Sequence, residues 1–81
     1  MQKETAEILA KALRRRLALI GDQELRERDP EGQLQALGAI SQEIDQLVQT
    51  HGREITGQLR HYFAQCSYQK ALTELESISA S

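Results

Sequence analysis

Three side chains in this sequence are of types that could carry out chemistry: His51, His61 and Cys66. A cysteine beside a histidine can act as a nucleophile, and converging histidine, cysteine and carboxylate groups can bind a metal ion. The spacing argues against both. His61 and Cys66 are five residues apart, on different faces of one expected helix, and we expect Cys66 to lie on its apolar face. His51 falls at the end of the preceding helix, where a histidine commonly interacts with free backbone carbonyls. We therefore expect no catalytic residue, no metal site and no cofactor.

The glycines provide no phosphate-binding loop either. Gly32, Gly38, Gly52 and Gly57 each stand alone within a helical pattern, whereas such loops need several glycines close together. A chain of 81 residues also leaves little room for a substrate pocket. These observations argue against an enzyme.

Length and composition indicate one helical domain, residues 1–81. A chain this short buries only about 60% of its unfolded surface, so it gains much from a partner. A single cysteine excludes an internal disulfide bond and is typical of a reducing compartment, so we expect the protein in the cytoplasm. The longest unbroken apolar run has four residues, 17–20, far below the ~20 needed to span a membrane.

Charge is distributed unevenly along the chain. No Lys or Arg lies between Asp29 and Gly52, whereas most of the cations precede Asp29. Both stretches have amphipathic periodicity, so a basic helix and an acidic helix are suited to pack side by side. The net charge of −2 argues against a dedicated nucleic-acid-binding protein.

Helical periodicity predicts the elements. In a helix over residues 3–20 the apolar side chains cover an arc of about 180°, which is wide enough for two neighbours. Gly21 ends this helix and Asp22 offers a restart. A second helix over 30–50 has Asp29 as N-cap and Pro30 as its first residue. Its narrow apolar stripe consists of Leu34, Leu37, Ile40, Ile44, Leu47 and Val48.

The last third of the chain changes phase after Cys66. Apolar residues from Ile55 to Cys66 share one face of a helix over 53–66, but those of residues 67–79 lie almost opposite. Two accounts fit: a turn at Cys66-Ser67 with Ser67 capping a new helix, or one straight helix that meets two partners. We favour the turn.

Three consecutive arginines form the clearest recognition signal. Lys11, Arg14 and Arg15 lie on the solvated face of the first helix, where they could form a basic patch. Arg16 lies within the apolar arc. We expect Arg16 to extend to solvent or to pair with Glu43 or Asp45 of the acidic helix.

The sequence therefore predicts an all-α fold: a small bundle of three to four helices (about 3–20, 30–50, 53–66 and 67–79), completed by dimerisation. We expect a non-catalytic protein–protein interaction or regulatory module that pairs with itself and with another protein. We do not expect it to bind a membrane. The alternative is a dimeric nucleic-acid-binding protein that uses the basic patch, although the charge balance favours it less. The residues expected to make the interaction are Leu13, Arg16, Leu17, Ile20, Leu72 and Leu75.

Overall fold

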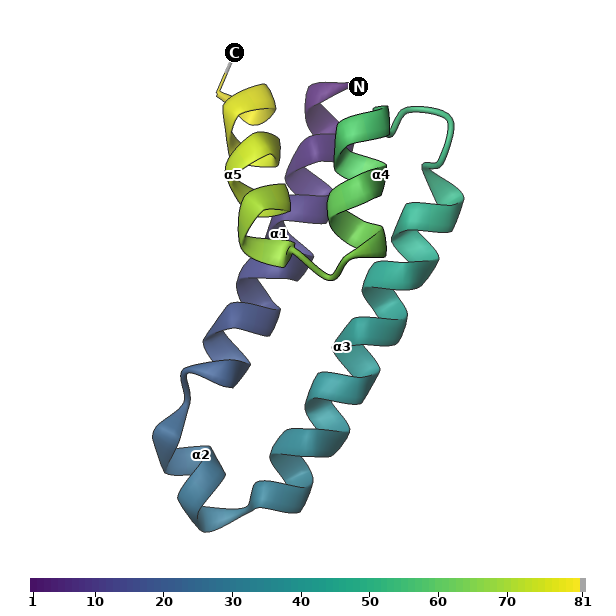
Figure 1. Ribbon diagram of the computed structural model, residues 1–81. Helices are drawn as coiled ribbons and strands as arrows, with labels where there is room; N and C mark the ends of the chain where they lie inside the picture. Colours follow the sequence, from purple (N-terminus) through teal and green to yellow (C-terminus); the bar gives the residue numbers. More distant parts are fainter. Residues whose placement is uncertain (81) are drawn as a thin grey trace.

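The computed structural model describes residues 1–80 and confirms the all-α fold (Figure 1). Within those residues the chain forms five helices and no strand. The helices are α1 (Lys3–Ile20), α2 (Gln23–Arg28), α3 (Pro30–Thr50), α4 (Gly57–Ala64) and α5 (Tyr68–Ser79). None of them is both long enough and apolar enough to cross a lipid bilayer.

The two long helices, α1 and α3, run antiparallel, and the short α4–α5 hairpin packs over one end of them (Figure 1). The apolar arc of α1 is wide because this helix contacts both α3 and α5. The core therefore lies at the end of the molecule where α1, α3, α4 and α5 meet. Its buried apolar residues are Ala6, Leu9, Ala10, Ala12, Leu13, Ile40, Ile44, Ile55, Leu59, Ala71, Leu72 and Leu75.

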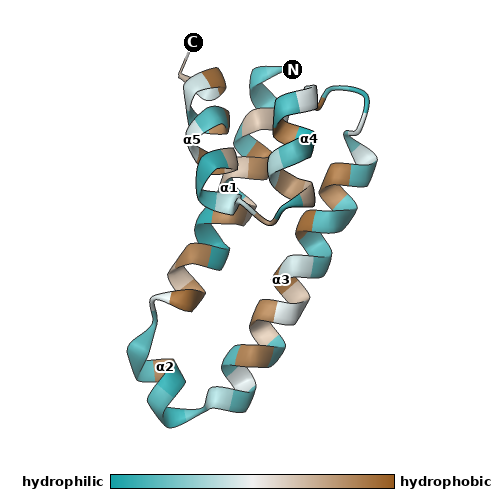
Figure 2. Ribbon diagram, viewed as in Figure 1, coloured by the Kyte–Doolittle hydropathy of each residue, from teal (hydrophilic) through white to brown (hydrophobic). Residues whose placement is uncertain are grey.

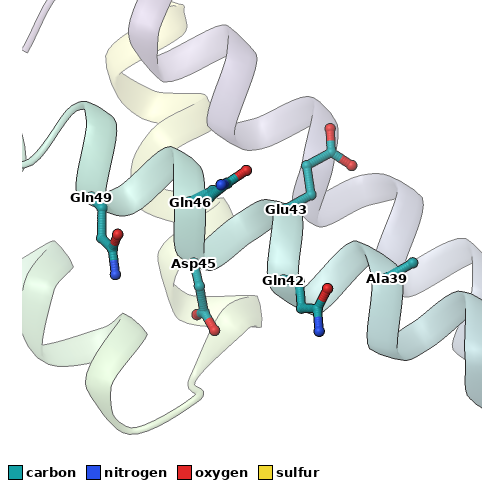
Figure 3. A pocket seen from close by; sticks show the side chains of 6 residues that line it. All are labelled: Ala39, Gln42, Glu43, Asp45, Gln46 and Gln49. Atoms are coloured by element: carbon teal, nitrogen blue, oxygen red, sulfur yellow. The ribbon is translucent and has the colours of Figure 1, made fainter.

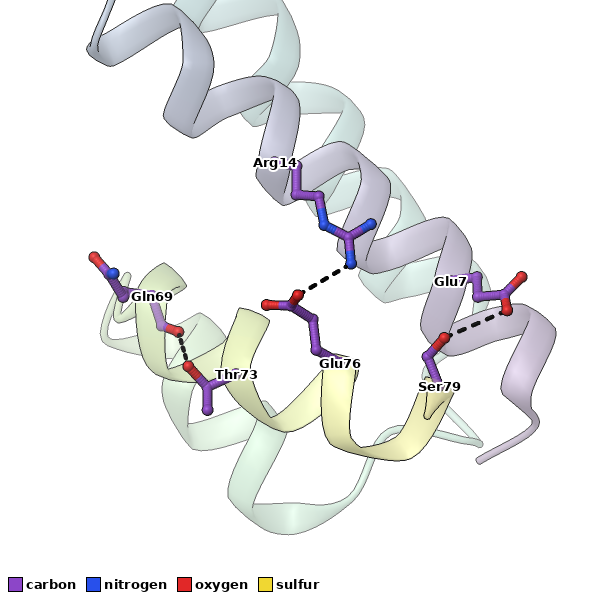
Figure 4. Close-up of polar contacts among 6 residues, drawn as sticks. All are labelled: Glu7, Arg14, Gln69, Thr73, Glu76 and Ser79. Atoms are coloured by element: carbon purple, nitrogen blue, oxygen red, sulfur yellow. Dashed lines mark hydrogen bonds and ion pairs between the residues drawn. The ribbon is translucent and has the colours of Figure 1, made fainter. Parts of the chain in front are cut away.

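Polar contacts join α1 to α5 along the edge of this core (Figure 4). Arg14 donates to Glu76 at 3.3 Å, and the Ser79 hydroxyl donates to Glu7, also at 3.3 Å. Both contacts are exposed, and exposed ion pairs contribute about 1 kcal/mol at most. They fix the alignment of α5 on α1 more than they stabilise the fold.

The two helix starts predicted after Gly21, with Asp22 and Asp29 as N-caps, are confirmed. The Asp22 carboxylate accepts a hydrogen bond from the Leu25 backbone N–H at 3.0 Å, and Asp29 accepts one from the Gly32 N–H, also at 3.0 Å. The restart at Asp22 forms the short helix α2, which the predicted set of four helices did not include. Side-chain capping of free N–H groups accounts for both starts.

The helix expected over 53–66 starts later than predicted. The chain turns after α3, and α4 begins at Gly57 with Thr56 as its N-cap, whose hydroxyl accepts from the Leu59 N–H at 3.3 Å. The reason lies in the preceding turn, where Ile55 is buried in the core and Glu54 hydrogen-bonds the start of α1. Both contacts would be lost if the helix continued backwards through these residues.

The turn at Cys66-Ser67 is confirmed, because the two short helices form a hairpin. Cys66 has a φ of 56°, in the left-handed region. The Ser67 N–H donates to the Tyr62 carbonyl at 2.8 Å and the Cys66 N–H to that of Phe63 at 3.1 Å. This is the Schellman pattern that ends many helices. Ser67 is the N-cap residue of α5, but its side chain makes no capping hydrogen bond, so that part of the prediction was wrong.

The other end of the molecule lacks a third layer. Residues 17–39, from the end of α1 through α2 into the first half of α3, extend beyond the α4–α5 hairpin (Figure 1). We call this segment the free hairpin. Gln33 is its one buried residue, and its side-chain N–H donates to the Leu19 carbonyl at 2.8 Å. Arg26 donates to the adjacent Ile20 carbonyl at 2.8 Å. Both side chains bond carbonyls at the end of α1. Leu17, Leu19 and Leu37 of the free hairpin are partly buried and pack against the core.

Replacement of Cys66 by Gly is expected to stabilise the fold. A side chain in the left-handed region costs about 1 kcal/mol, and glycine avoids that cost. Urea unfolding followed by circular dichroism should give a higher midpoint for Cys66→Gly than for the matched control Cys66→Ala. The alanine variant loses the same thiol but keeps the β-carbon, so equal midpoints for the two variants would contradict this account of the turn.

Candidate interaction surface

The three residues that could carry out chemistry do not come together. Cys66 is exposed in the α4–α5 turn, so its expected place on the apolar face was wrong, because the left-handed turn takes it out of the helix. His61 is exposed on α4. His51 is the C-cap residue of α3, as expected, and its backbone N–H donates to the Leu47 carbonyl at 3.0 Å. Its Nδ1 atom lies 3.5 Å from a carboxylate oxygen of Glu54. Within residues 1–80, no group of three His, Cys, Asp or Glu side chains is arranged to hold a metal ion.

Glu54 has a structural role that the sequence did not reveal. Its carboxylate accepts hydrogen bonds from the Gln2 backbone N–H at 3.1 Å and from the Thr5 hydroxyl at 2.9 and 3.0 Å. Gln2 is the N-cap of α1, and its own side chain makes no cap. A carboxylate far away in the sequence therefore closes the start of α1, which is favourable at the positive end of a helix dipole.

The arginine cluster spreads over three directions. Arg14 pairs with Glu76 of α5, whereas Arg15 pairs with Glu43 of α3 at 3.2 Å. The predicted pairing of Arg16 with Glu43 or Asp45 was therefore wrong by one residue. Since consecutive residues differ by 100° around a helix, that step decides which neighbour each arginine meets.

Arg16 instead lies on α1 beside the start of α5, where the packing of α1, α3, α4 and α5 ends. Its guanidinium carbon is 4.4 Å from the centre of the Tyr68 ring at the start of α5, a favourable cation–π geometry. Burial, with smaller contributions from Cys66 and Asp45, raises the pKa of Tyr68 above 10.0, against an opposing effect of Arg16. The buried Arg16 Nε has no hydrogen-bond partner among the described residues. Arg16 and Tyr68 thus mark the boundary between the core and the free hairpin.

The surface hollows do not resemble a substrate site. One of about 450 Å³ is lined by side chains of α3 alone (Figure 3): Ala39, Gln42, Glu43, Asp45, Gln46 and Gln49. Side chains of one helix diverge into solvent and cannot enclose a ligand. A more apolar groove of about 490 Å³ runs between α1 and α3, lined by Arg15, Ala18, Leu19, Ala36, Ala39, Ile40 and Glu43. We call it the α1–α3 groove.

The residues expected to make the interaction divide into two groups. Leu13, Leu72 and Leu75 are buried in the core of the chain itself. Leu17 and Ile20 are only partly buried and lie on the free hairpin, and Arg16 lies at its boundary. A contact with another molecule on the folded surface is therefore open to this second group.

Two leucines of α3 join that group. Leu34 is 68% exposed and Leu37 is partly buried. Leu34 and Leu37 precede Asp45 and Val48 by eleven residues each, or about three helical turns, so each pair shares a face. Asp45 and Val48 line a hollow against α4. Leu34 and Leu37 therefore lie on the side of α3 that faces α4, beyond the point where α4 ends.

The same continuation occurs on α1. Leu17 follows the buried Ala6 by eleven residues, and Ile20 follows the buried Leu9 by eleven. Figure 2 shows apolar segments on both arms of the free hairpin and a hydrophilic tip at α2. We call the four residues Leu17, Ile20, Leu34 and Leu37 the exposed stripe. Leu34 is largely exposed, and the other three are partly buried, with Leu17 and Leu37 packed against the core on one side.

Comparison with known protein families, with curated proteins and with solved structures finds no significant match.

Stability is expected to fall in acid through Glu54. Hydrogen bonds from the Gln2 N–H and Thr5, with His51 nearby, hold the pKa of this carboxyl below its ordinary value of 4.5. The folded state therefore favours the carboxylate, and this contribution is present above pH 4.5 and is lost as the pH falls through the lower, folded-state pKa. Glu54→Gln should lower the urea midpoint at pH 7 and reduce its dependence on pH below 4.5. Glu4→Gln, an exposed change in the same region, is the control. If the urea midpoints of wild type and Glu54→Gln fell equally with pH below 4.5, Glu54 would not have this role in stability.

Proposed function

We propose that this protein is a non-catalytic protein–protein interaction module that assembles as a homodimer. One observation carries the proposal: the apolar faces of α1 and α3 continue beyond the α4–α5 hairpin, where Leu34 is largely exposed and Leu17, Ile20 and Leu37 are only partly buried. An exposed apolar patch with a polar surround is typical of an interaction site. Leu34, at 68% exposure, is the least covered of its residues.

The shape of the molecule supports the same proposal. Its radius of gyration is 13.2 Å, and it measures 39 × 23 × 20 Å. A compact domain of this length has a radius of gyration of about 12 Å. The excess comes from the free hairpin, which extends along the long axis instead of folding back on the core (Figure 1).

The alternative of a nucleic-acid interface receives less support. Arg14 and Arg15 each pair with a carboxylate, on α5 and α3 respectively, so the basic patch with Lys11 is split and partly neutralised. Phosphate binding depends on several uncompensated cations on one face. The lone thiol of Cys66, exposed in a turn, fits a reducing compartment such as the cytoplasm.

Analytical ultracentrifugation tests the homodimer. At micromolar concentration we expect a species of about twice the 9.2 kDa chain mass, because burial of the exposed stripe drives association. Added salt should change the mass little if apolar contact dominates. A single species of 9 kDa across the accessible concentration range would overturn the proposal, and a salt-sensitive shift with RNA or DNA would favour the alternative.

A further inference from the structure

We propose that a second copy of this chain docks on the exposed stripe in an antiparallel, two-fold arrangement, so that each free hairpin completes the layer that the α4–α5 hairpin begins. The inference rests on the proposed homodimer and adds its surface and geometry. Leu17, Ile20, Leu34 and Leu37 of one copy would meet the same four residues of the other. Such a self-complementary contact is what a two-fold axis requires.

The chain exposes more surface than a compact monomer of its mass. The chain exposes 5516 Å², whereas a compact monomer of its mass exposes about 4,900 Å². The excess, about 600 Å², is about three quarters of the roughly 800 Å² that each partner buries in a standard interface.

The position of the α4–α5 hairpin selects the antiparallel direction. This hairpin lies on the same face of α3 as the exposed stripe, at the other end of the molecule. In a parallel pair, both α4–α5 hairpins would occupy the same space between the long helices. In an antiparallel pair, each lies beyond the tip of its partner, and the tip reaches the turn at Cys66.

Charge selects the same direction. The tip, residues 22–31, carries five carboxylates and two arginines, for a formal net charge of −3. Residues 8–21 of α1 carry Lys11, Arg14, Arg15 and Arg16 and no carboxylate, for a formal net charge of +4. Ion pairs with Glu76 and Glu43 compensate two of these charges, those of Arg14 and Arg15. A parallel pair brings acidic tip against acidic tip. An antiparallel pair moves each acidic tip toward the basic part of the partner's α1, where Arg16 marks the end of the core, and this arrangement is favourable.

Substitution of the stripe tests the surface. Leu34→Glu should weaken dimerisation by on the order of 100-fold in Kd, because two buried leucines are replaced by charges. Leu34 is exposed in the single chain, so circular dichroism should show a fold like that of the wild type. The matched control is Ala39→Glu, which adds the same charge to α3 in the α1–α3 groove and should leave the Kd nearly unchanged.

Cross-linking tests the direction. Arg28→Cys places a thiol at the tip, and Cys66 supplies the other thiol in the α4–α5 turn. A short bis-maleimide should convert Arg28→Cys into a covalent dimer on a denaturing gel. The wild type, whose one thiol is Cys66, should not form this covalent dimer, because the two α4–α5 turns lie far apart. The double variant Arg28→Cys/Cys66→Ser should not form it either, because the two tips lie far apart.

The outcomes separate this inference from the homodimer itself. If the wild type is a dimer but Ala39→Glu dissociates it and Leu34→Glu does not, the groove is the interface and the inference falls alone. If the double variant Arg28→Cys/Cys66→Ser cross-links as fully as Arg28→Cys does, the two tips meet and the pair is parallel. The inference then again falls alone. If the wild type is monomeric, both the inference and the homodimer fall.

Discussion

The whole structure depends on the burial of one wide apolar face, that of α1. This helix contacts α3 on one side and α5 on the other, and its buried residues form nearly half of the core. A face of about 180° cannot be covered by one neighbour. The second neighbour, α5, lies only along the first part of α1. The chain therefore has one end where α1, α3, α4 and α5 pack together, and the free hairpin at the other.

The ends of α1 are closed by side chains from other elements. Glu54 accepts from the Gln2 N–H at the start, and Gln33 donates to the Leu19 carbonyl at the end. Free N–H and carbonyl groups at helix ends need partners. At the start of α1 the side chain of the N-cap residue, Gln2, makes no cap, whereas at the end the Gly21 N–H donates to the Leu17 carbonyl. The turn after α3 and the start of α3 are thus held in place by the requirements of α1. This explains why residues that look like plain loop positions have defined contacts.

The asymmetry between the two ends of the molecule leads to the proposed function. At one end, leucines and isoleucines of α1 and α3 are buried where these two helices pack against each other and where α5 packs on α1. At the other, side chains of the same helical phase remain partly or largely exposed. The chemistry-capable residues lie apart and mostly exposed, and the most apolar groove follows two helices rather than a closed cavity. What the surface offers is a place to dock, and its repeated leucines and opposite charges suit a second copy.

The sequence by itself determined the local structure: the bounds of α1 and α3, the caps at Asp22 and Asp29, and the break at Cys66. These follow from helical periodicity and from capping, which act within a few residues. Only the tertiary structure decided which neighbour each face meets. It paired Glu43 with Arg15 rather than with Arg16, placed Glu54 at the start of α1, and left Leu34 largely exposed. Periodicity gives the phase of a side chain around its own helix but not the position of the next helix, because that position is set by packing between distant parts of the chain.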